Sequence, residues 1–159
     1  MSSIVYFGSI RLGRNRALIE IADALRTINA DYKIEVYSGE SDPSLYEGLK
    51  AHPNVVYGGS IPYSEVQKKT AECDIFVITE GFREEDINFT RYSLSTKAAD
   101  SLASGAAILM YGPEDAGVVD YMKGTGAAIV CSNQKSLAKD IKELINDVDH
   151  QKIMYDCAI

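Results

Sequence analysis

The chain has 159 residues, of which 46% are apolar, and it can therefore bury the core of one α/β domain. Its formal net charge of -7 and its pI near 4.8 argue against non-specific binding to nucleic acid or to an anionic membrane surface, since both need a basic footprint. No apolar run approaches the roughly 20 residues that span a bilayer, and the start MSSIVYFGSI lacks the pattern of a signal peptide. We therefore expect a cytoplasmic location. A further domain of the protein could still contact a membrane surface.

Short apolar runs along the chain predict six strands, at residues 4–7, 34–37, 54–57, 74–78, 107–110 and 127–131. Apolar residues at helical spacing lie between them, at residues 16–25, 63–71, 96–104, 118–123 and 136–148. Residues 149–159 have weaker periodicity and are expected to form a terminal helix or a tail. Strands that alternate with helices form βαβ units. The predicted fold is therefore α/β, a Rossmann-like doubly wound parallel sheet of about six strands with helices on both faces.

The loops at the carboxyl ends of the predicted strands are the candidate ligand site. In an open parallel sheet, ligands bind beyond these ends, near the point where the strand order reverses. Nearly all of these loops carry glycine or other small residues, which allow backbone amides to approach a ligand. The loops comprise residues 8–14, 39–41, 58–62, 79–82 and 112–115.

The first of these loops, GSIRLGR, has neither the GxGxxG pattern of dinucleotide-binding proteins nor the GxxxxGK[ST] pattern of P-loop hydrolases. Both classes are disfavoured. Gly8 allows close approach, and the guanidinium groups of Arg11 and Arg14 can clamp phosphate oxygens in forked geometry. The alternative is that both arginines are simply exposed at a helix start, where they would oppose the helix dipole.

The segment SLSTKAADSLASG, residues 93–105, predicts a helix whose first turns carry a basic and an acidic group. Ser93 and Ser95 can cap its start, while Lys97 and Asp100 are three residues apart and share one face. Helix N-termini attract anions, and a lysine there strengthens the attraction. The segment is therefore a candidate binding segment for a phosphate-bearing ligand. The alternative is that Lys97 and Asp100 form an ordinary surface salt bridge.

The segment that follows the fourth predicted strand, residues 80–92, is polar and long for a βα connection. Its charged residues include Arg83, Asp86 and Arg91. Two interpretations stay open: a mobile flap that closes on a ligand, and a solvated run of charges.

Cysteine and histidine chemistry is not indicated. Cys73, Cys131 and Cys157 are scattered, with no CxxC pair and no histidine at metal-ligand spacing, and the first two lie beside apolar runs typical of core residues. His52 and His150 stand in polar settings and are expected at the surface. They give no support to a Ser-His-Asp or Cys-His catalytic set.

Several segments together resemble a known family. They are FGSI..GRNRALIEIADAL, KIEVYSG, NVVYGGSIPYSEVQKKTAECDIFVITEGF, SLSTKAADSLASGAAILMYGP and TGAAIVC, and they cover essentially the whole chain. Their order is similar to the C-terminal, donor-binding domain of GT-B glycosyltransferases of the group 1 type, enzymes with two Rossmann-like domains. The most specific part is an S-x-K-x-x-[DE]-x-L-A-x-G block, which begins at Ser95 and contains Lys97 and Asp100.

This resemblance implies a hexosyltransferase-type enzyme whose substrate is a nucleoside-diphosphate sugar, used for glycan or polysaccharide synthesis. Asp100 would accept hydrogen bonds from the ribose, Lys97 and an arginine of the first loop would face the diphosphate, and the backbone around Ser60 and Ile61 would hold the base. Glu80 would approach the donor sugar or the ribose. No cofactor and no metal are implied, since no DxD pair stands at a strand end.

The chain also departs from the family pattern. Many members carry two glutamates separated by seven residues, and the first of these positions falls on Tyr92, so that Glu80 would be a displaced counterpart. The N-terminal domain that binds the glycan acceptor has no counterpart in 159 residues, so residues 1–159 are expected to be one domain that is inactive alone. Two alternatives remain: a stand-alone nucleotide-binding or regulatory module, and half of a sugar-nucleotide epimerase.

Overall fold

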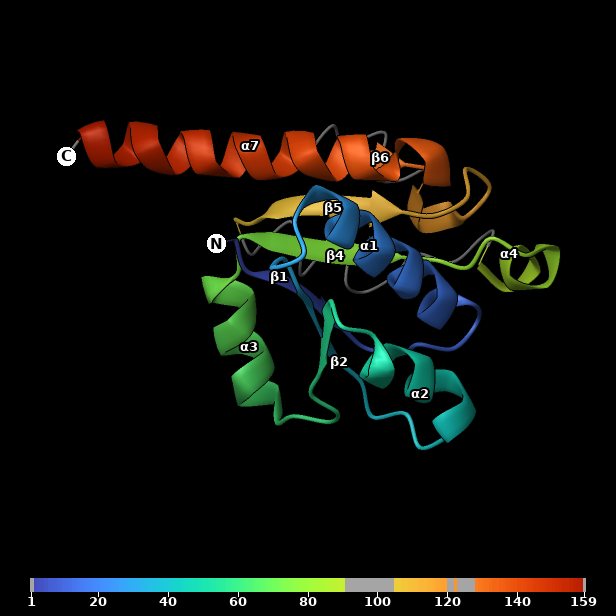
Figure 1. Ribbon diagram of the computed structural model, residues 1–159. Coiled ribbons are helices and arrows are strands. Elements are labelled where there is room, and N and C mark those ends of the chain that lie inside the picture. The colour runs from blue at the N-terminus through green and yellow to red at the C-terminus, as the bar shows by residue number, and fades with distance from the viewer. Residues whose placement is uncertain (1, 91–104, 120–121, 123–127, 159) are drawn as a thin grey trace.

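The computed structural model of the chain describes residues 2–90, 105–119, 122 and 128–158 (Figure 1). Its strands form one sheet in the order β3-β2-β1-β4-β5-β6, and all neighbours are parallel. They are β1 (Ile4–Phe7), β2 (Ile34–Tyr37), β3 (Val55–Tyr57), β4 (Ile75–Thr79), β5 (Ala107–Tyr111) and β6 (Ile129–Cys131). The chain builds the sheet outward in two directions from the neighbours β1 and β4, which confirms the predicted doubly wound fold.

Helices cover both faces of this sheet (Figure 1). One face packs against α1 (Arg14–Ile28), α2 (Pro43–Ala51) and the long α7 (Gln134–Ala158). The other face packs against α3 (Tyr63–Glu72) and against apolar residues between positions 116 and 122. The short α4 (Glu84–Thr90) lies beyond the carboxyl ends of the strands. In the part of the chain that the structure describes, the carboxyl edge of the sheet therefore carries loops and the short α4.

The core lies on both faces of the strands. In β1, Ile4 and Tyr6 belong to the cluster on the α1 side, whereas Val5 and Phe7 belong to the cluster on the α3 side. All four side chains are buried, so the strand reads as a continuous apolar run instead of an alternating one. The same double burial holds for β4, and it explains why short apolar runs located the strands.

The helix α2 is an element that the sequence analysis missed. Its start carries a recognisable signal, because the Asp42 side chain accepts a hydrogen bond from the Ser44 backbone N–H at 3.0 Å and Pro43 occupies the first turn. Its interior is short, with Leu49 buried and Leu45 and Tyr46 partly buried against the core. The capping residues are therefore its clearest sign in the sequence.

Two further segments refine the prediction. The region expected to be a flap or a solvated charge run contains the helix α4, in which Asp86 and Thr90 are buried. The terminal segment continues α7 to Ala158, so of the two expected forms, a helix or a tail, it takes that of a helix. The helix predicted at residues 96–104 and half of the one at 118–123 lie outside the described residues. Among the residues described above, no helix is long and apolar enough to cross a membrane.

Candidate functional site

The candidate site lies where the loops after β1 and β4 meet at the carboxyl edge of the sheet. These two strands are neighbours, and the chain leaves them in opposite directions, which makes this the switch point of the topology. The first loop is tightly turned, because the Arg14 and Asn15 N–H groups donate to the carbonyls of Arg11 and Ile10, at 3.2 and 3.0 Å. A crevice at this point is where an open α/β sheet binds its ligand.

The backbone of the first loop takes conformations that favour glycine. Gly8 has φ 120° and Gly13 has φ 78°, and between them Leu12 has φ 57°, a rare value for a residue with a side chain. Gly13 directly precedes α1 and gives it no side-chain cap. A strained turn at the head of a helix is a common feature of ligand sites, and here it brings the loop close to the segment after β4.

Arg14 and Glu80 form an ion pair across the switch point. The Arg14 Nε and Nη2 atoms donate to the two carboxylate oxygens of Glu80, at 3.1 and 3.3 Å. The Glu80 side chain is only 5% exposed, and that of Arg14 is 19% exposed. The buried Tyr6 hydroxyl donates to the Ser9 carbonyl at 2.5 Å, and burial raises the pKa of Tyr6, an effect that the nearby Arg14 charge partly offsets. The site thus holds a fixed cation, Arg14, whose counter-ion is the Glu80 carboxylate of the same chain.

Arg11 is paired with a second carboxylate. Its Nε and Nη2 atoms donate to the two Glu40 oxygens at 2.7 and 2.9 Å, and Glu40 also accepts from the Ser41 and Asp42 N–H groups, each at 3.1 Å. The Arg11 guanidinium holds the pKa of the Glu40 carboxyl below its usual range. This contact draws the arginine over the loop after β2. Sequence reasoning missed Glu40, although a carboxylate beside Gly39 was a visible signal.

Asp86 is the least expected residue of the site. It is 4% exposed, and its carboxylate lies against Gly13 and Gly81, neither of which has room for a Cβ atom. Arg16 and Arg83 approach its Oδ2 atom at 3.7 Å, yet that oxygen is buried and has no hydrogen-bond partner among the residues that the structure describes. An acidic side chain therefore occupies the space between the two loops, at the head of α1.

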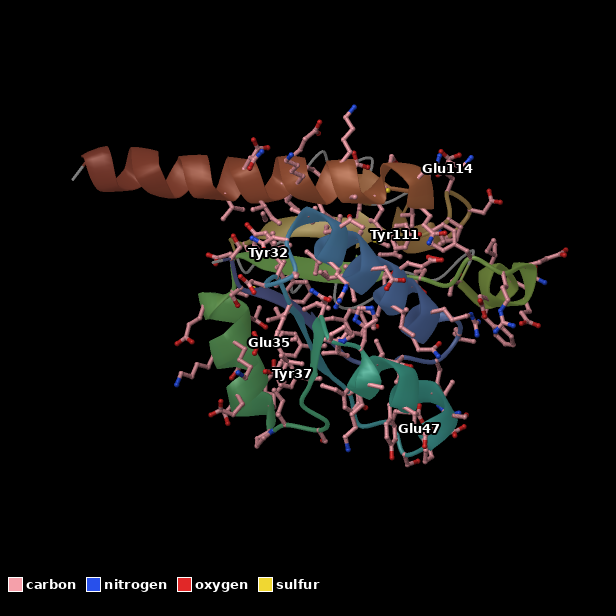
Figure 2. All side chains as sticks on the ribbon, viewed as in Figure 1. Tyr32, Glu35, Tyr37, Glu47, Tyr111 and Glu114 are labelled. Carbon is pink, nitrogen blue, oxygen red and sulfur yellow. The ribbon has the colours of Figure 1, made fainter. Side chains whose placement is uncertain are left out.

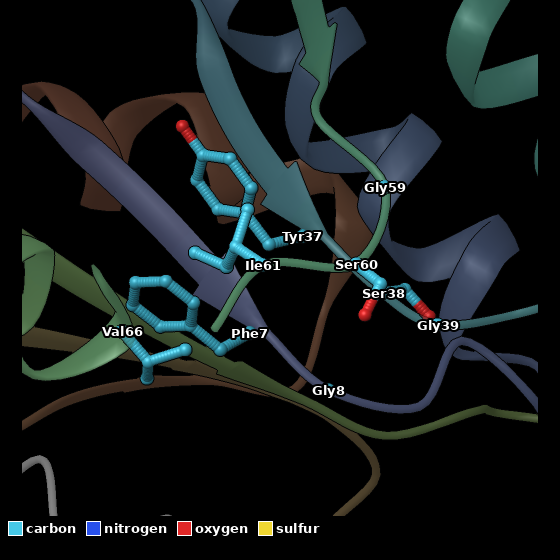
Figure 3. A pocket seen from close by; sticks show the side chains of 9 residues that line it. All are labelled: Phe7, Gly8, Tyr37, Ser38, Gly39, Gly59, Ser60, Ile61 and Val66. Atoms are coloured by element: carbon cyan, nitrogen blue, oxygen red, sulfur yellow. The ribbon is translucent and has the colours of Figure 1, made fainter. Parts of the chain in front are cut away.

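A hollow of about 240 Å³ opens over the ends of β1, β2 and β3 (Figure 3). The rings of Phe7 and Tyr37 stack at 5.5 Å in its wall, and Gly58 leaves room for the Tyr37 ring. Gly59, with φ 68°, turns the chain at its rim. The hollow is smaller than the about 300–1,000 Å³ of a typical ligand pocket, so it suits one ring of a ligand. It is lined by Phe7, Gly8, Tyr37, Ser38, Gly39, Gly59, Ser60, Ile61 and Val66.

Two solved structures share this fold over 92% of the chain. One is the apo-form glycosyltransferase GlyE of Streptococcus pneumoniae TIGR4, with a TM-score of 0.58, 11% identity and 33% of its length covered. The other is sucrose-phosphate synthase from Thermosynechococcus elongatus, with a TM-score of 0.61, 14% identity and 37% covered. The fold is that of one domain of a GT-B glycosyltransferase. The chain spans about a third of the length of both proteins.

The match to GT-B domains is a match of fold and not of sequence. No protein-family model matches the chain, and no curated protein matches it in sequence. The resemblance expected from the sequence is confirmed at this level, and the coverage fits a single domain of such an enzyme. Residue roles have to be argued from the geometry of the site itself.

Within this GT-B-like domain, the structure brings together some of the predicted site residues. Gly8, Ser60 and Ile61 line the hollow, and Arg14 meets Glu80 at the switch point. Arg11 is instead held by Glu40. The predicted ligand contacts Ser95, Lys97 and Asp100 lie outside the described residues.

The cysteines that the structure describes are core residues, as predicted. Cys73 and Cys131 are 7% and 2% exposed, and burial raises the pKa of both thiols, that of Cys73 to about 11. His52, expected at the surface, is partly exposed, with 12% of its side chain accessible. Its Nδ1 accepts from the Asn54 N–H at 3.0 Å, and its Nε2 lies 2.7 Å from an Asp23 oxygen. This histidine joins α1 to the turn before β3.

Proposed function

We propose that the chain is the nucleotide-sugar-binding domain of a glycosyltransferase, which in a larger protein transfers a glycosyl group from a nucleoside-diphosphate sugar to an acceptor. One juxtaposition carries the proposal: the hollow lined by Gly8, Ser60 and Ile61 opens at the same sheet edge as the head of α1 and the Arg14 guanidinium. A base needs a small cavity with accessible backbone groups, and a diphosphate needs positive charge at a helix N-terminus. The fold match to a solved glycosyltransferase adds support.

Each part of the donor has a proposed place. The base lies in the hollow against the backbone of Ser60 and Ile61, and the diphosphate lies over the first loop. Glu80 contacts the donor sugar or the ribose. Lys97 binds the diphosphate, and Asp100 accepts hydrogen bonds from the ribose hydroxyls.

Arg14 has a direct role in this scheme. When the glycosidic bond breaks, negative charge develops on the departing diphosphate, and a fixed cation stabilises it. A guanidinium has five N–H groups, and Arg14 directs only its Nε and one Nη2 group at Glu80. It can therefore bind a phosphate oxygen while Glu80 still fixes its orientation.

Calorimetric titration with UDP, GDP, ADP and dTDP, and with the matching monophosphates, tests the proposal. We expect saturable binding of one diphosphate. Lys97→Ala should weaken it by about 1.5–3 kcal/mol, the worth of a lost charged hydrogen bond, whereas Lys50→Ala, on the exposed side of α2, should not change it. Asp100→Asn should weaken the nucleoside diphosphate and leave inorganic pyrophosphate unaffected. Lack of binding by all four diphosphates, or equal affinity of the two lysine variants, would contradict the proposal.

A further inference from the structure

The features of the proposed nucleotide site follow the order of the strands along the carboxyl edge of the sheet. The hollow opens over the ends of β3, β2 and β1, and the Arg14–Glu80 pair joins the loops after β1 and β4. The Arg11–Glu40 pair joins the loops after β1 and β2, and so comes between these two features in the strand order. In a nucleoside diphosphate, the ribose likewise stands between the base and the diphosphate. A ligand with its base in the hollow therefore brings its ribose to the Arg11–Glu40 pair.

Glu40 is anchored at the rim of the hollow by the backbone of its own loop. Its N–H group donates to the Ser38 hydroxyl at 3.3 Å, and both Ser38 and Gly39 line the hollow. The Ser41 and Asp42 N–H groups each donate to the Oε1 atom of Glu40 at 3.1 Å. The position of this carboxylate thus does not depend on its arginine partner.

The two carboxylate oxygens of Glu40 are unequally occupied. Oε1 accepts from the Arg11 Nη2 atom and from two backbone N–H groups, whereas among the described residues Oε2 accepts only from the Arg11 Nε atom, at 2.7 Å. The Arg11 side chain is 62% exposed, while that of Glu40 is 6% exposed. Because this guanidinium stands in solvent, exchanging Glu40 for another anionic partner costs it little. Oε2 is therefore the oxygen that a ligand can take over.

A carboxylate that follows the second strand of such a sheet is suited to a ribose. In doubly wound sheets that bind nucleotides, an acidic residue after the second strand accepts a hydrogen bond from the ribose 2′-hydroxyl. A charged acceptor makes this bond roughly twice as strong as a neutral one. The displaced Arg11 guanidinium gains a new partner in the diphosphate, whose oxygens match its forked geometry. One exchange of partners thus serves both the ribose and the diphosphate.

We propose that Glu40 makes the site selective for ribonucleoside diphosphates over their 2′-deoxy forms, and that Arg11 moves from Glu40 to the diphosphate when the ligand binds. The 2′-hydroxyl donates to Oε2 of Glu40, which leaves the 3′-hydroxyl for Asp100. A 2′-deoxyribose has no hydroxyl to replace the guanidinium at Oε2, so the exchange leaves that oxygen without a partner. The inference rests on the proposed function, and it narrows the donor to a ribonucleotide, with dTDP-sugars disfavoured.

The test is calorimetric titration of the complete chain with UDP, GDP and ADP, each compared with its 2′-deoxy form. The ribonucleotide that binds should do so about tenfold or more tightly than its 2′-deoxy form, because it alone makes a hydrogen bond to a charged acceptor. Glu40→Gln keeps one oxygen for the two backbone N–H groups and places an amide NH₂ group where Oε2 was. It should reduce the preference to about threefold or less, and Glu40→Ala should abolish it.

Inorganic pyrophosphate separates the two halves of the proposal, because it has no ribose. Its affinity should not fall in Glu40→Gln, where Arg11 loses a competing carboxylate, and it should fall several-fold in Arg11→Ala. The matched control is Glu47→Gln, which removes an exposed carboxylate from α2 (Figure 2) and should change neither the preference for ribose nor the affinity for pyrophosphate.

Three results would overturn this inference and leave the proposed function standing. They are equal affinity of the parent chain for the ribose and 2′-deoxy forms, a preference that survives both substitutions of Glu40, and the same loss of preference in Glu47→Gln. Absence of binding by every diphosphate would instead refute the proposed function, and this inference with it.

Discussion

Replacing Asp86 with asparagine should make the site bind phosphate more tightly. The Asp86 carboxylate lies against Gly13 and Gly81 at the head of α1, where the proposed diphosphate would approach. A phosphate oxygen about 5 Å away would be repelled by about 3 kcal/mol per unit charge at an effective dielectric constant of 20. Arg16 and Arg83, at 3.7 Å, offset part of this repulsion, and a net penalty of about 1.5 kcal/mol corresponds to about tenfold in affinity.

The assay is calorimetric titration with inorganic pyrophosphate, together with thermal unfolding of each variant. Asp86→Asn should lower the dissociation constant about tenfold and change the free energy of unfolding by less than about 1 kcal/mol, because its arginine partners are half exposed and such pairs are weak. Glu85→Gln removes an exposed carboxylate from the same helix and should change neither quantity. If Asp86→Asn binds pyrophosphate no better than the parent chain, or if Glu85→Gln gives the same gain, the reasoning is wrong.

Three further predictions concern stability. Arg14→Ala should lower the free energy of unfolding by about 2–3 kcal/mol in urea denaturation, because the buried Glu80 carboxylate loses the charge of Arg14. Glu80→Gln in the same chain should restore part of the loss, and additive effects of the two substitutions would contradict this. Asn54→Ala should cost about 2–3 kcal/mol, since this fully buried amide donates to two carbonyls at 3.1 and 2.7 Å, and a loss below about 0.5 kcal/mol would count against it. Burial raises the pKa of Cys73 from 9.0 to about 11, so the folded chain retains the proton more strongly than the unfolded chain. The stabilising contribution of this thiol is complete below pH 9 and falls as the pH rises towards 11, and a Cys73→Ala variant should lack this part of the pH dependence in urea titrations.

The strands could be predicted because a strand that is buried on both faces shows as an uninterrupted apolar run in its own sequence. Every residue of β1 and β4 is buried, and the first four residues of β4, Ile75 to Ile78, are therefore apolar without interruption. The helix α2 escaped because it is short: Leu49 is its only fully buried residue, and Leu45 and Tyr46 pack against the core while staying partly exposed. A stronger weight on the Asp42 and Pro43 start signal would have found it.

The ion pairs of the site were beyond sequence reasoning. Arg11 and Glu40 are 29 positions apart, and Arg14 and Glu80 are 66 apart. Which carboxylate meets which arginine depends on the order of the strands and on the path of each loop, and neither follows from residue types. Sequence reasoning could name the loops, because small residues at strand ends are visible, but it could not pair the charges within them.

The pairing of these two arginines has a consequence for the rate at which a ligand arrives. Each guanidinium already faces a carboxylate of its own, so the two pairs contribute no net positive field at the mouth of the crevice, and the whole chain carries a charge of -7. Electrostatic steering would not concentrate a dianion there. The net negative charge is instead expected to slow association of a dianion, and the association rate should rise with ionic strength as salt screens the repulsion. Differences in affinity between ligands would then come from the dissociation rate and not from the association rate.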